Sequence, residues 1–432
     1  MALDLLKLTR GLTIASMLAL ASATIGATVA CSAEAPSEAS SDDGSGSSTD
    51  DITSVNQTAV KRQSIGNCWL YATTSWLEAL NKAATNEELN TSESWLTYWH
   101  WYEQLANGRA SGEISTGGSY GTAANLIARY GVTLEKDFIK AEAESEMSSR
   151  QSSALNAVNA SLKNGALKDA VARRDKKAIR KELDAAWQLD AATTARINAV
   201  FGEAVDKTLD RAYVRSAPGN GIIRAIDFPA RMKDTQSGQF VKGTLADAIG
   251  AGSSWGPRQG KLAFNSVDYP SGNVERRAFW KRVQKALHDE VPVIISWKVD
   301  FNALTSDSHF SFEQLQSRGP GRHGGHMTVA HDYQADVPGL GVLKAGEPAT
   351  KEQMEKALSD DTKIVFLRVK NSWGGIRPDR WNQAAIAGYH DLDYKYLNGP
   401  IKECPGEDAP ADPSVCTGTT VPLWDAVLPA GY

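Results

Sequence analysis

The sequence has few cysteines, no excess of charge of one sign and, after residue 30, no long apolar run. Four cysteines in 432 residues are too few for a fold built on disulfides. Lys and Arg number 46 against 51 Asp and Glu, a net charge of −5, so no nucleic-acid partner is expected. Hydrophobic residues make up 42% of the chain, which excludes wholesale disorder and fibrous repeats. Beyond residue 30 no apolar stretch approaches the roughly 18 residues of a membrane span.

The N-terminal residues have the layout of an export signal. Lys7 and Arg10 precede residues 11–30, which are almost uncharged and rich in Ala and Leu. A basic start, an apolar run and small residues at the exit are typical of a secretory signal, so we expect a signal peptide over residues 1–30. An uncleaved anchor is the alternative, because the run is also just long enough to span a bilayer.

Cys31 follows Thr28-Val29-Ala30, which resembles a bacterial lipobox with Thr28 at the position usually held by Leu, Val or Ile. We therefore expect lipidation at Cys31 and a lipid membrane as a partner, at the outer membrane or cell surface. The alternative is an ordinary secreted or periplasmic protein. Residues 31–55 are mostly Ser, Asp, Gly and Ala and predict a flexible tether, because they cannot bury enough apolar surface to fold.

Cys68 opens a helical pattern. Apolar residues recur after it at three- and four-residue spacing, and Gly66-Asn67 interrupts the chain just before it, with Asn67 as the expected N-cap. A cysteine in the first turn of a helix lies at the positive end of the dipole, which favours the thiolate. A buried core cysteine is the alternative on position alone.

Gln63, Gly66, Cys68 and Trp69 together resemble the nucleophile motif of papain-like cysteine peptidases. The resemblance implies that the Gln63 side chain and the Cys68 backbone N–H form an oxyanion hole. Gln63 lies five residues before Cys68, whereas the family has six, and Arg62 occupies the usual position. We expect the loop to be one residue shorter, with Gln63 still reaching the site.

A thiolate needs a base that later protonates the leaving amine. Among seven histidines, His326 precedes a branched apolar run and is expected to begin a buried strand, as in the family's His strand. The odd spacing puts His331 on the opposite face, and His323 in a Gly-rich loop is expected to be exposed. A metal site formed by these three histidines is the weaker alternative, because no acidic cluster accompanies them. We expect no metal and no cofactor.

The segment Asn371-Ser372-Trp373-Gly374 follows a predicted strand over 364–369 and resembles the family's Asn motif. The resemblance implies that the Asn371 carbonyl orients the imidazole of His326 and that Trp373 shields this bond and borders the substrate. The order Cys, His, Asn argues against a transglutaminase, which would have Asp as the third residue.

Three further segments resemble the bleomycin hydrolase and bacterial aminopeptidase C branch: residues 89–105, 115–132 and 279–300. The resemblance implies that Gly117 and Gly118 bind the substrate backbone, with a plain turn as the alternative. The C-terminal sequence resembles the tail of that branch, whose last residue lies in the cleft. Tyr432 is therefore either in the cleft, giving aminopeptidase action, or packed on the domain surface.

Cys404 and Cys416 flank a polar, Pro-containing loop, and we expect a local disulfide that leaves Cys68 free. Residues 141–215 are rich in Ala, Lys, Glu and Arg and predict a helical insertion with solvated faces. A second insertion follows His326 and should contain a short surface helix.

Together these features predict one papain-like domain over residues 56–432, with the helical insertion and a C-terminal extension at 400–432. The fold class is α+β: a helical half carries Cys68 and an antiparallel β half carries His326 and Asn371. The expected function is an exported thiol-dependent peptidase that acts on peptides or proteins through an acyl-enzyme. The alternatives are an aminopeptidase, acyl transfer to an amine, and a catalytically degenerate surface binding protein. The sequence alone does not identify the substrate or the oligomeric state.

Overall fold

The computed structural model describes residues 55–110, 112–209, 221–234, 236–375 and 386–432. The expected signal peptide over residues 1–30, Cys31 and nearly all of the tether lie outside these residues. No helix in the described ranges is long and apolar enough to cross a membrane.

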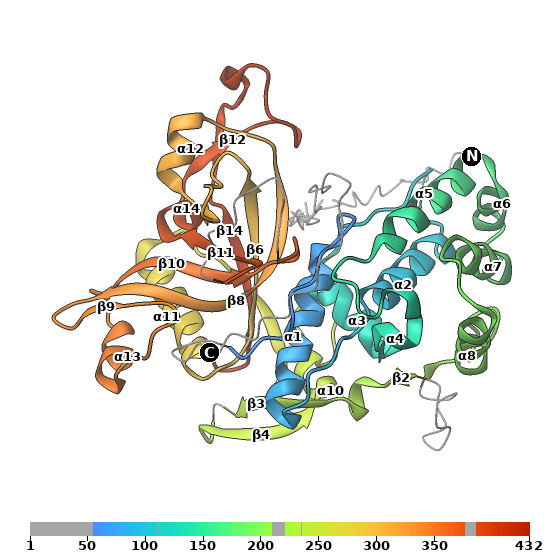
Figure 1. Cartoon of the computed structure of the whole chain (residues 1–432), viewed down its shortest axis with the longest axis horizontal. Coiled ribbons are helices and arrows are strands. Elements are labelled where there is room, and N and C mark those ends of the chain that lie inside the picture. The colour runs from blue at the N-terminus through green and yellow to red at the C-terminus, as the bar shows by residue number, and fades with distance from the viewer. Residues whose placement is uncertain (1–54, 111, 210–220, 235, 376–385) are drawn as a thin grey trace, which may run out of the picture.

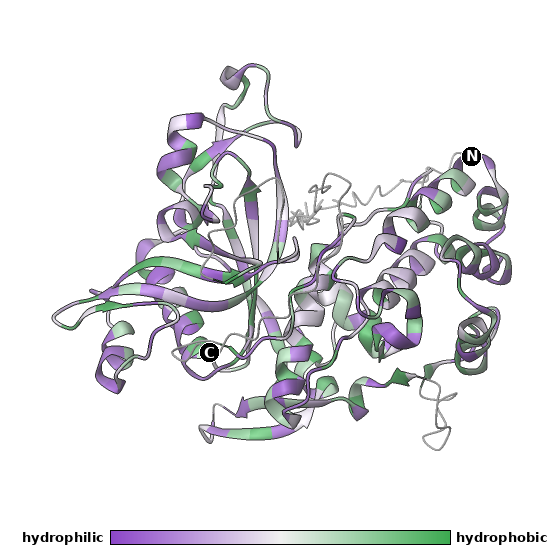
Figure 2. Ribbon diagram, in the orientation of Figure 1, coloured by the Kyte–Doolittle hydropathy of each residue, from purple (hydrophilic) through white to green (hydrophobic). Residues whose placement is uncertain are grey.

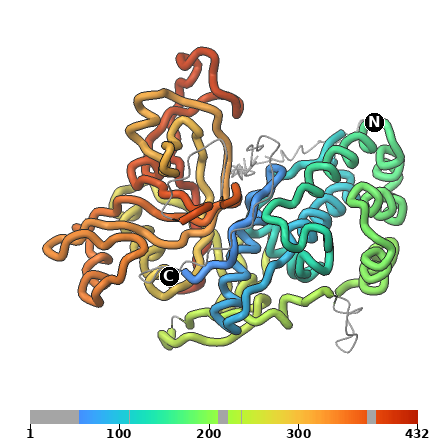
Figure 3. Tube along the Cα trace, in the orientation of Figure 1, coloured from blue at the N-terminus to red at the C-terminus, as the bar shows by residue number. Residues whose placement is uncertain are grey.

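The chain folds into a helical half and a β half, which lie side by side (Figure 1). The N-terminal part of the chain forms the helical half, and the C-terminal part forms the β half, so that the two colour ranges of the trace separate cleanly (Figure 3). Helix α1 (Cys68–Thr85) lies between them and packs against strand β8 (His323–Val337). The predicted α+β class is therefore confirmed.

The helical half is a succession of helices that begins with α1. These elements are α1, α2 (Glu93–Ala106), α3 (Tyr120–Tyr130), α4 (Glu135–Phe138), η1 (Lys140–Glu142), α5 (Ser149–Asn164), α6 (Ala166–Ala172), α7 (Lys176–Ala186) and α8 (Ala191–Phe201).

The helix termini follow from local sequence. Ser92 caps α2 by accepting a hydrogen bond from the backbone N–H of Trp95 at 3.0 Å. Helix α1 is followed by its C-cap Asn86, which adopts the left-handed conformation (φ 60°) that closes many helices. Helix α3 is followed by its C-cap Gly131, whose φ of 68° suits a residue without a Cβ.

Helix α2 is buried on nearly every face, since it packs against α1, α3, α4 and α7. Its tryptophans form the aromatic centre of this half: the ring of Trp99 stacks on Tyr130 with centroids 4.0 Å apart, and Trp95 meets Phe138 edge-on. Helices α5 to α8 surround this centre with mixed polar and apolar faces, as the hydropathy colouring shows (Figure 2).

The β half contains a large sheet whose strands run in the order β5-β14-β6-β8-β10-β11-β7, with β9 paired to β8. Neighbouring strands are antiparallel except for β11 and β7. Its strands are β5 (Phe264–Asp268), β6 (Val293–Asp300), β7 (His309–Phe310), β8, β9 (Gly341–Leu343), β10 (Lys363–Lys370), β11 (Tyr389–Asp393) and β14 (Leu423–Pro429).

The remaining elements are short or flank the sheet. Three two-stranded ribbons are β1 (Val132–Thr133) with β2 (Ile222–Ile223), β3 (Pro229–Asp234) with β4 (Gln239–Thr244), and β12 (Ile401–Glu403) with β13 (Gly418–Thr420). The flanking helices are η2 (Ala225–Asp227), α10 (Leu245–Ile249), α11 (Asn273–His288), α12 (Phe312–Arg318), α13 (Lys351–Ala357), α14 (Tyr394–Asn398) and η3 (Pro413–Val415). Helix α13 is the short helix expected in the second insertion.

The C-terminal segment packs on the domain and not in a cleft. Strand β14 lies inside the sheet, between β5 and β6, and runs antiparallel to β6. The Tyr432 hydroxyl donates to Asp289, just before β6 begins, whereas Trp297, the partner of His326, lies toward the other end of β6. The alternative that places Tyr432 in the cleft is therefore wrong, because the pairing of β14 carries the chain end away from His326.

The predicted disulfide between Cys404 and Cys416 is confirmed. It closes the loop that connects β12 to β13. The backbone carbonyl of Glu407 in this loop accepts a hydrogen bond from the N–H of His323 at 2.8 Å, which places the loop beside the beginning of β8.

Candidate active site

Cys68 is the first residue of α1 and is fully buried. Asn67 is the N-cap residue of α1, as predicted, but its side chain makes no capping hydrogen bond. The Asn67 amide instead donates to Thr97 and to Gln151, each at 2.9 Å, because these acceptors face it from α2 and α5. Asn67 therefore ties the segment before Cys68 to the helical half.

Cys68 is disulfide-bonded in this structure. The expectation that pairing of the other cysteines leaves it as a free thiol is therefore wrong for the structure as it stands. A sulfur in a disulfide has no thiolate form, and the thiolate is the nucleophile of cysteine chemistry. Any reaction at Cys68 thus requires reduction of this bond first.

The imidazole of His326 is oriented by Asn371. His326 Nε2 lies 2.8 Å from Asn371 Oδ1, and both side chains are almost completely buried. His326 belongs to the buried strand β8, although it is the fourth residue of the strand and not the first. Asn371 follows β10 directly, and the backbone N–H of Ser372 also donates to Asn371 Oδ1, at 2.7 Å.

Trp373 covers this pair. Its ring lies nearly parallel to the imidazole of His326, with centroids 4.8 Å apart and an angle of 21° between the planes. The tryptophan is only 4% exposed and packs on Phe301 and Phe310. Water is thereby kept from the bond between His326 and Asn371, which strengthens it.

His390 was not predicted and lies directly behind Asn371. Its Nδ1 atom lies 3.3 Å from Asn371 Nδ2, so the neutral ring accepts from the amide. The ring also meets Trp373 edge-on, with centroids 5.1 Å apart. A strand signal in residues 388–393, pairing back onto the strand before Asn371, could have indicated this position, because an antiparallel hairpin returns β11 beside β10.

Burial lowers the pKa of His326 to about 4, and the hydrogen bond with Asn371 opposes this shift only in part. The ring is therefore neutral at physiological pH with Cys68 oxidised. A thiolate nearby would reverse the balance, since an opposite charge favours the imidazolium.

Gln63 lies at the same interface and is 1% exposed. Its Nε2 donates to the carbonyl of Ile65 at 2.8 Å, and its Oε1 accepts from the Ser372 hydroxyl at 2.5 Å. Gln63 is therefore held between the segment before Cys68 and the segment after Asn371, with one amide N–H beyond its bond to Ile65.

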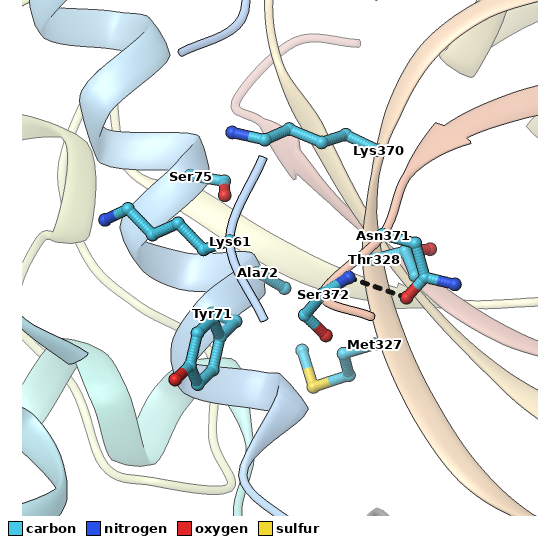
Figure 4. Close-up of a pocket in the computed structure, with 9 residues that line it drawn as sticks. All are labelled: Lys61, Tyr71, Ala72, Ser75, Met327, Thr328, Lys370, Asn371 and Ser372. Carbon is cyan, nitrogen blue, oxygen red and sulfur yellow. Dashed lines mark hydrogen bonds between the residues drawn. The ribbon is translucent and has the colours of Figure 1, made fainter. Parts of the chain in front are cut away.

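A small pocket lies between the halves beside these residues (Figure 4). From the helical side it is lined by Tyr71, Ala72 and Ser75, one or two turns along α1 from Cys68. From the β side it is lined by Asn371 itself and by residues one or two positions after His326 or Asn371, namely Met327, Thr328 and Ser372. Lys61 and Lys370 complete the lining. The first turns of α1 and the strand of His326 thus meet at one place.

A network of buried charges lies behind this pocket. Lys61 Nζ lies 2.8 Å from a carboxylate oxygen of both Glu78 and Glu93. Thr58 donates to Glu78 at 2.7 Å and lies 3.0 Å from Lys370 Nζ, which donates to it. The network therefore links β10, immediately before Asn371, to α1 and α2.

Burial and mutual attraction set the pKa values in this network. Burial acts to lower the pKa of Lys61, but attraction to Glu78 and Glu93 outweighs it, so the pKa is raised. Burial lowers the pKa of Lys370 to about 8, although Glu78 opposes the shift. Burial, reinforced by repulsion from Glu93, raises the pKa of the nearby Glu135 to about 8.

Gly117 and Gly118 lie in the segment before α3, close to the ring of Trp69, the residue after Cys68. A Cβ on Gly118 would lie 2.4 Å from this indole ring, so only glycine fits. Trp69 Nε1 donates to the carbonyl of Thr116 at 2.8 Å and fixes the same segment. The glycines therefore run beside the helix that begins with Cys68.

The other histidines of β8 are separate from this pair. His323 is 4% exposed, so its predicted exposure is wrong: β8 begins at this residue and the loop of Glu407 covers it. His331 Nδ1 lies 3.1 Å from the carbonyl of Val55. In the described residues, no three His, Cys, Asp or Glu side chains are placed to hold a metal ion.

Comparison with known proteins gives matches to solved structures only. No family model and no curated protein matches the sequence. PepW from Lactobacillus rhamnosis is similar with a TM-score of 0.39 and 14% identity, over 89% of this chain and 82% of that one. Xylellain, a cysteine protease from Xylella fastidiosa, is similar with a TM-score of 0.30 and 10% identity, over 85% and 82%. A cysteine protease from Carica candamarcensis is similar with a TM-score of 0.27 and 13% identity, over 86% and 92%.

The sequence identities and TM-scores of these matches are low, so they assign no role to any residue of this chain. A buried cysteine begins a helix, and the strand packed on that helix carries a histidine whose imidazole is oriented by an asparagine under a tryptophan. The chain is similar in this respect to papain-like cysteine peptidases, the family that its motifs resemble.

Proposed function

We propose that the protein is a thiol-dependent peptidase that becomes active when Cys68 is reduced. The observation that carries the proposal is the bond between His326 and Asn371 beneath Trp373, on the strand that packs against the helix begun by Cys68. An imidazole oriented by an asparagine has one nitrogen committed to that bond, and the other nitrogen is the one that a catalytic thiol has to meet.

In this proposal the Cys68 thiolate attacks a peptide carbonyl and forms an acyl-enzyme. The imidazolium of His326 protonates the leaving amine, and water then releases the acyl group. The backbone N–H of Cys68 and the remaining amide N–H of Gln63 stabilise the oxyanion, since Cys68 begins α1 and Gln63 is held in the segment just before it. Gly117 and Gly118 bond the backbone of the acyl part of the substrate.

The same proposal places the enzyme outside the cytoplasm. The signal-like residues 1–30 and the lipobox-like context of Cys31 support export and a lipid anchor. In the anchored protein the sulfur of Cys31 is a thioether and takes part in no disulfide. The substrates are then peptides or proteins that reach the cell surface or periplasm.

A peptide-library digestion tests the activity. The full chain is incubated with a reductant and with peptides whose amino termini are free or blocked, beside the Cys68→Ala variant. We expect cleavage of both peptide sets by the reduced wild type and none by Cys68→Ala. Cleavage limited to free amino termini would instead require an exopeptidase mechanism that does not use Tyr432.

An alkylation assay separates the enzyme from a degenerate binding protein. A thiolate stabilised by His326 reacts with iodoacetamide faster at neutral pH than an ordinary thiol does. If reduced Cys68 reacts no faster than a free thiol in solution, and no peptide is cleaved, the peptidase proposal fails.

A further inference from the structure

Arg322 is a cation that lies beside the site. Among the described residues, no carboxylate lies within ion-pair distance of its guanidinium, and no side-chain hydrogen bond is formed by it. The guanidinium lies over the ring of Phe301, with its central carbon 4.8 Å from the ring centroid. The side chain is partly exposed.

The acidic residues on the two segments beside Arg322 do not pair with it. Asp300 accepts two bonds from the backbone N–H of Gly321, each at 3.1 Å, and one from Asn302. Glu407 meets β8 through its backbone carbonyl. The positive charge of Arg322 therefore remains available to a ligand, and a partly exposed cation held on an aromatic ring keeps its hydrogen-bonding edge open.

A continuous stack of rings joins Arg322 to the catalytic imidazole. The ring of Phe301 packs on Trp373 with centroids 5.5 Å apart, and Trp373 stacks on His326 at 4.8 Å. The position of the guanidinium is thus fixed relative to His326 by rigid groups and not by a loop alone.

The strand register gives the distance along the site. Arg322 immediately precedes β8, and the ladder with β6 is regular from His323, opposite Asp300, to His326, opposite Trp297. Because side chains alternate along a strand, residues 322 and 326 project from one face, about 13 Å apart along the backbone. The residue between them on that face is Gly324, which has no side chain to block the path.

The chemistry decides which part of a substrate meets Arg322. His326 has to reach the leaving amine, so the part of the substrate after the scissile bond lies on the His326 side. The acyl part lies along Gly117 and Gly118 on the helical half. An extended peptide advances about 3.3–3.6 Å per residue, and the arginine side chain itself bridges several ångströms, so the guanidinium meets the second or third residue after the bond.

We propose that Arg322 binds a carboxylate at this position and makes the enzyme selective for peptides that carry one. The carboxylate comes either from an acidic side chain or from the C-terminus of a short leaving peptide. The inference rests on the proposed peptidase function and names its substrate class. Arginine suits the role because its planar edge binds a carboxylate through two parallel hydrogen bonds.

Matched peptide pairs test this. All share one acyl sequence. One pair has Glu or Gln at the second position after the bond and a blocked C-terminus, and the other ends at that position as a free carboxylate or a carboxamide. The proteins compared, all reduced, are the wild type, Arg322→Gln, Arg322→Lys and Arg318→Gln. Arg318→Gln removes an exposed cation of α12 and is the control for the change in net charge.

We expect wild type and Arg318→Gln to prefer the carboxylate member of at least one pair about tenfold in kcat/KM. Arg322→Gln should remove this preference while leaving the amide substrates unchanged, and Arg322→Lys should keep part of it. The pair that shows the preference identifies the source of the carboxylate. Equal cleavage of both members by wild type, or an equal loss on both in Arg322→Gln, would overturn the inference.

Binding to Cys68→Ala separates this inference from the peptidase proposal. Fluorescence anisotropy measures the affinity of the same labelled peptides for Cys68→Ala with and without Arg322→Gln. Carboxylate-selective binding that depends on Arg322, without cleavage by wild type, would refute the peptidase but support the subsite. Cleavage without carboxylate selectivity in either assay would support the peptidase proposal and refute the carboxylate subsite.

Discussion

Replacement of His390 should reduce catalysis without disturbing the residues that meet the substrate. His390 Nδ1 accepts from the amide of Asn371, while Asn371 Oδ1 faces His326. If the amide rotates by 180°, its NH₂ group faces the N–H of His326, so the orienting bond is lost. His390→Phe keeps the ring between Phe310 and Trp373 but removes the acceptor.

The size of the effect follows from the bonds that remain. A buried amide donor that loses its acceptor costs about 1–3 kcal/mol. The N–H of Ser372 still donates to Asn371 Oδ1 at 2.7 Å and still favours the correct orientation. The activation free energy should therefore rise by about 1–2 kcal/mol, which corresponds to a fall in kcat of about 5- to 30-fold.

The assay measures the alkylation rate of reduced Cys68 between pH 5 and 9, together with peptide hydrolysis. Peptide mapping distinguishes the alkylation of Cys68 from that of the other cysteines. His390→Asn is the matched variant, because the Asn Oδ1 can replace the Nδ1 acceptor, and it should retain most activity. His309→Phe, on the neighbouring strand and paired with Asp391, should have no effect on Cys68. If His390→Phe and His390→Asn fall equally, or neither falls by more than about twofold, the orienting role is wrong.

Three further predictions concern buried groups near the site. Burial raises the pKa of Glu135 to about 8 from an ordinary value of 4.5, so its stabilising contribution is complete below pH 4.5 and is lost as the pH rises to 8. Glu135→Gln should therefore leave the melting temperature unchanged at pH 4.5. At pH 8 it should raise the melting temperature, with a gain of about 2–4 kcal/mol in the free energy of unfolding. Lys61→Met leaves Glu78 and Glu93 buried together and should cost about 3–5 kcal/mol in urea unfolding, and replacing both acids with Gln should recover most of it. Gly118→Ala drives a methyl group into the indole ring beneath it, so circular dichroism should show a folded protein of lower stability while kcat/KM falls more than tenfold; unchanged values would show that the segment moves aside freely.

The elements of the site could be predicted because each has a local signature. The helix from Cys68 has apolar spacing after a chain break, and it runs to Thr85 as the pattern indicates. The strand predicted over 364–369 is β10, and Asn371 follows it directly. Such patterns depend only on neighbours in sequence, which is why the order and type of these elements agree with the structure.

The errors arise where tertiary contacts outweigh local preference. Asn67 is the N-cap residue of α1 as expected, but its side chain makes no capping bond, because the bonds of its NH₂ group to acceptors on α2 and α5 fix the orientation of the amide. His323 was expected in an exposed loop, but the loop of Glu407 covers it. His390 could not be assigned from sequence, because only the pairing of β10 with β11 places it behind Asn371.

The buried charges explain how two separate halves can hold one site. Cys68 belongs to the helical half and His326 to the β half, so catalysis depends on their relative position to within a fraction of an ångström. Apolar contact between the halves is non-directional and cannot define that position alone. The path from Lys370 through Thr58 to Glu78 crosses the interface with bonds of 3.0 and 2.7 Å, one residue from Asn371 and ten from Cys68. Breaking that path at Thr58, with Thr58→Val, should therefore lower kcat more than KM, whereas a purely structural contact would change only the stability.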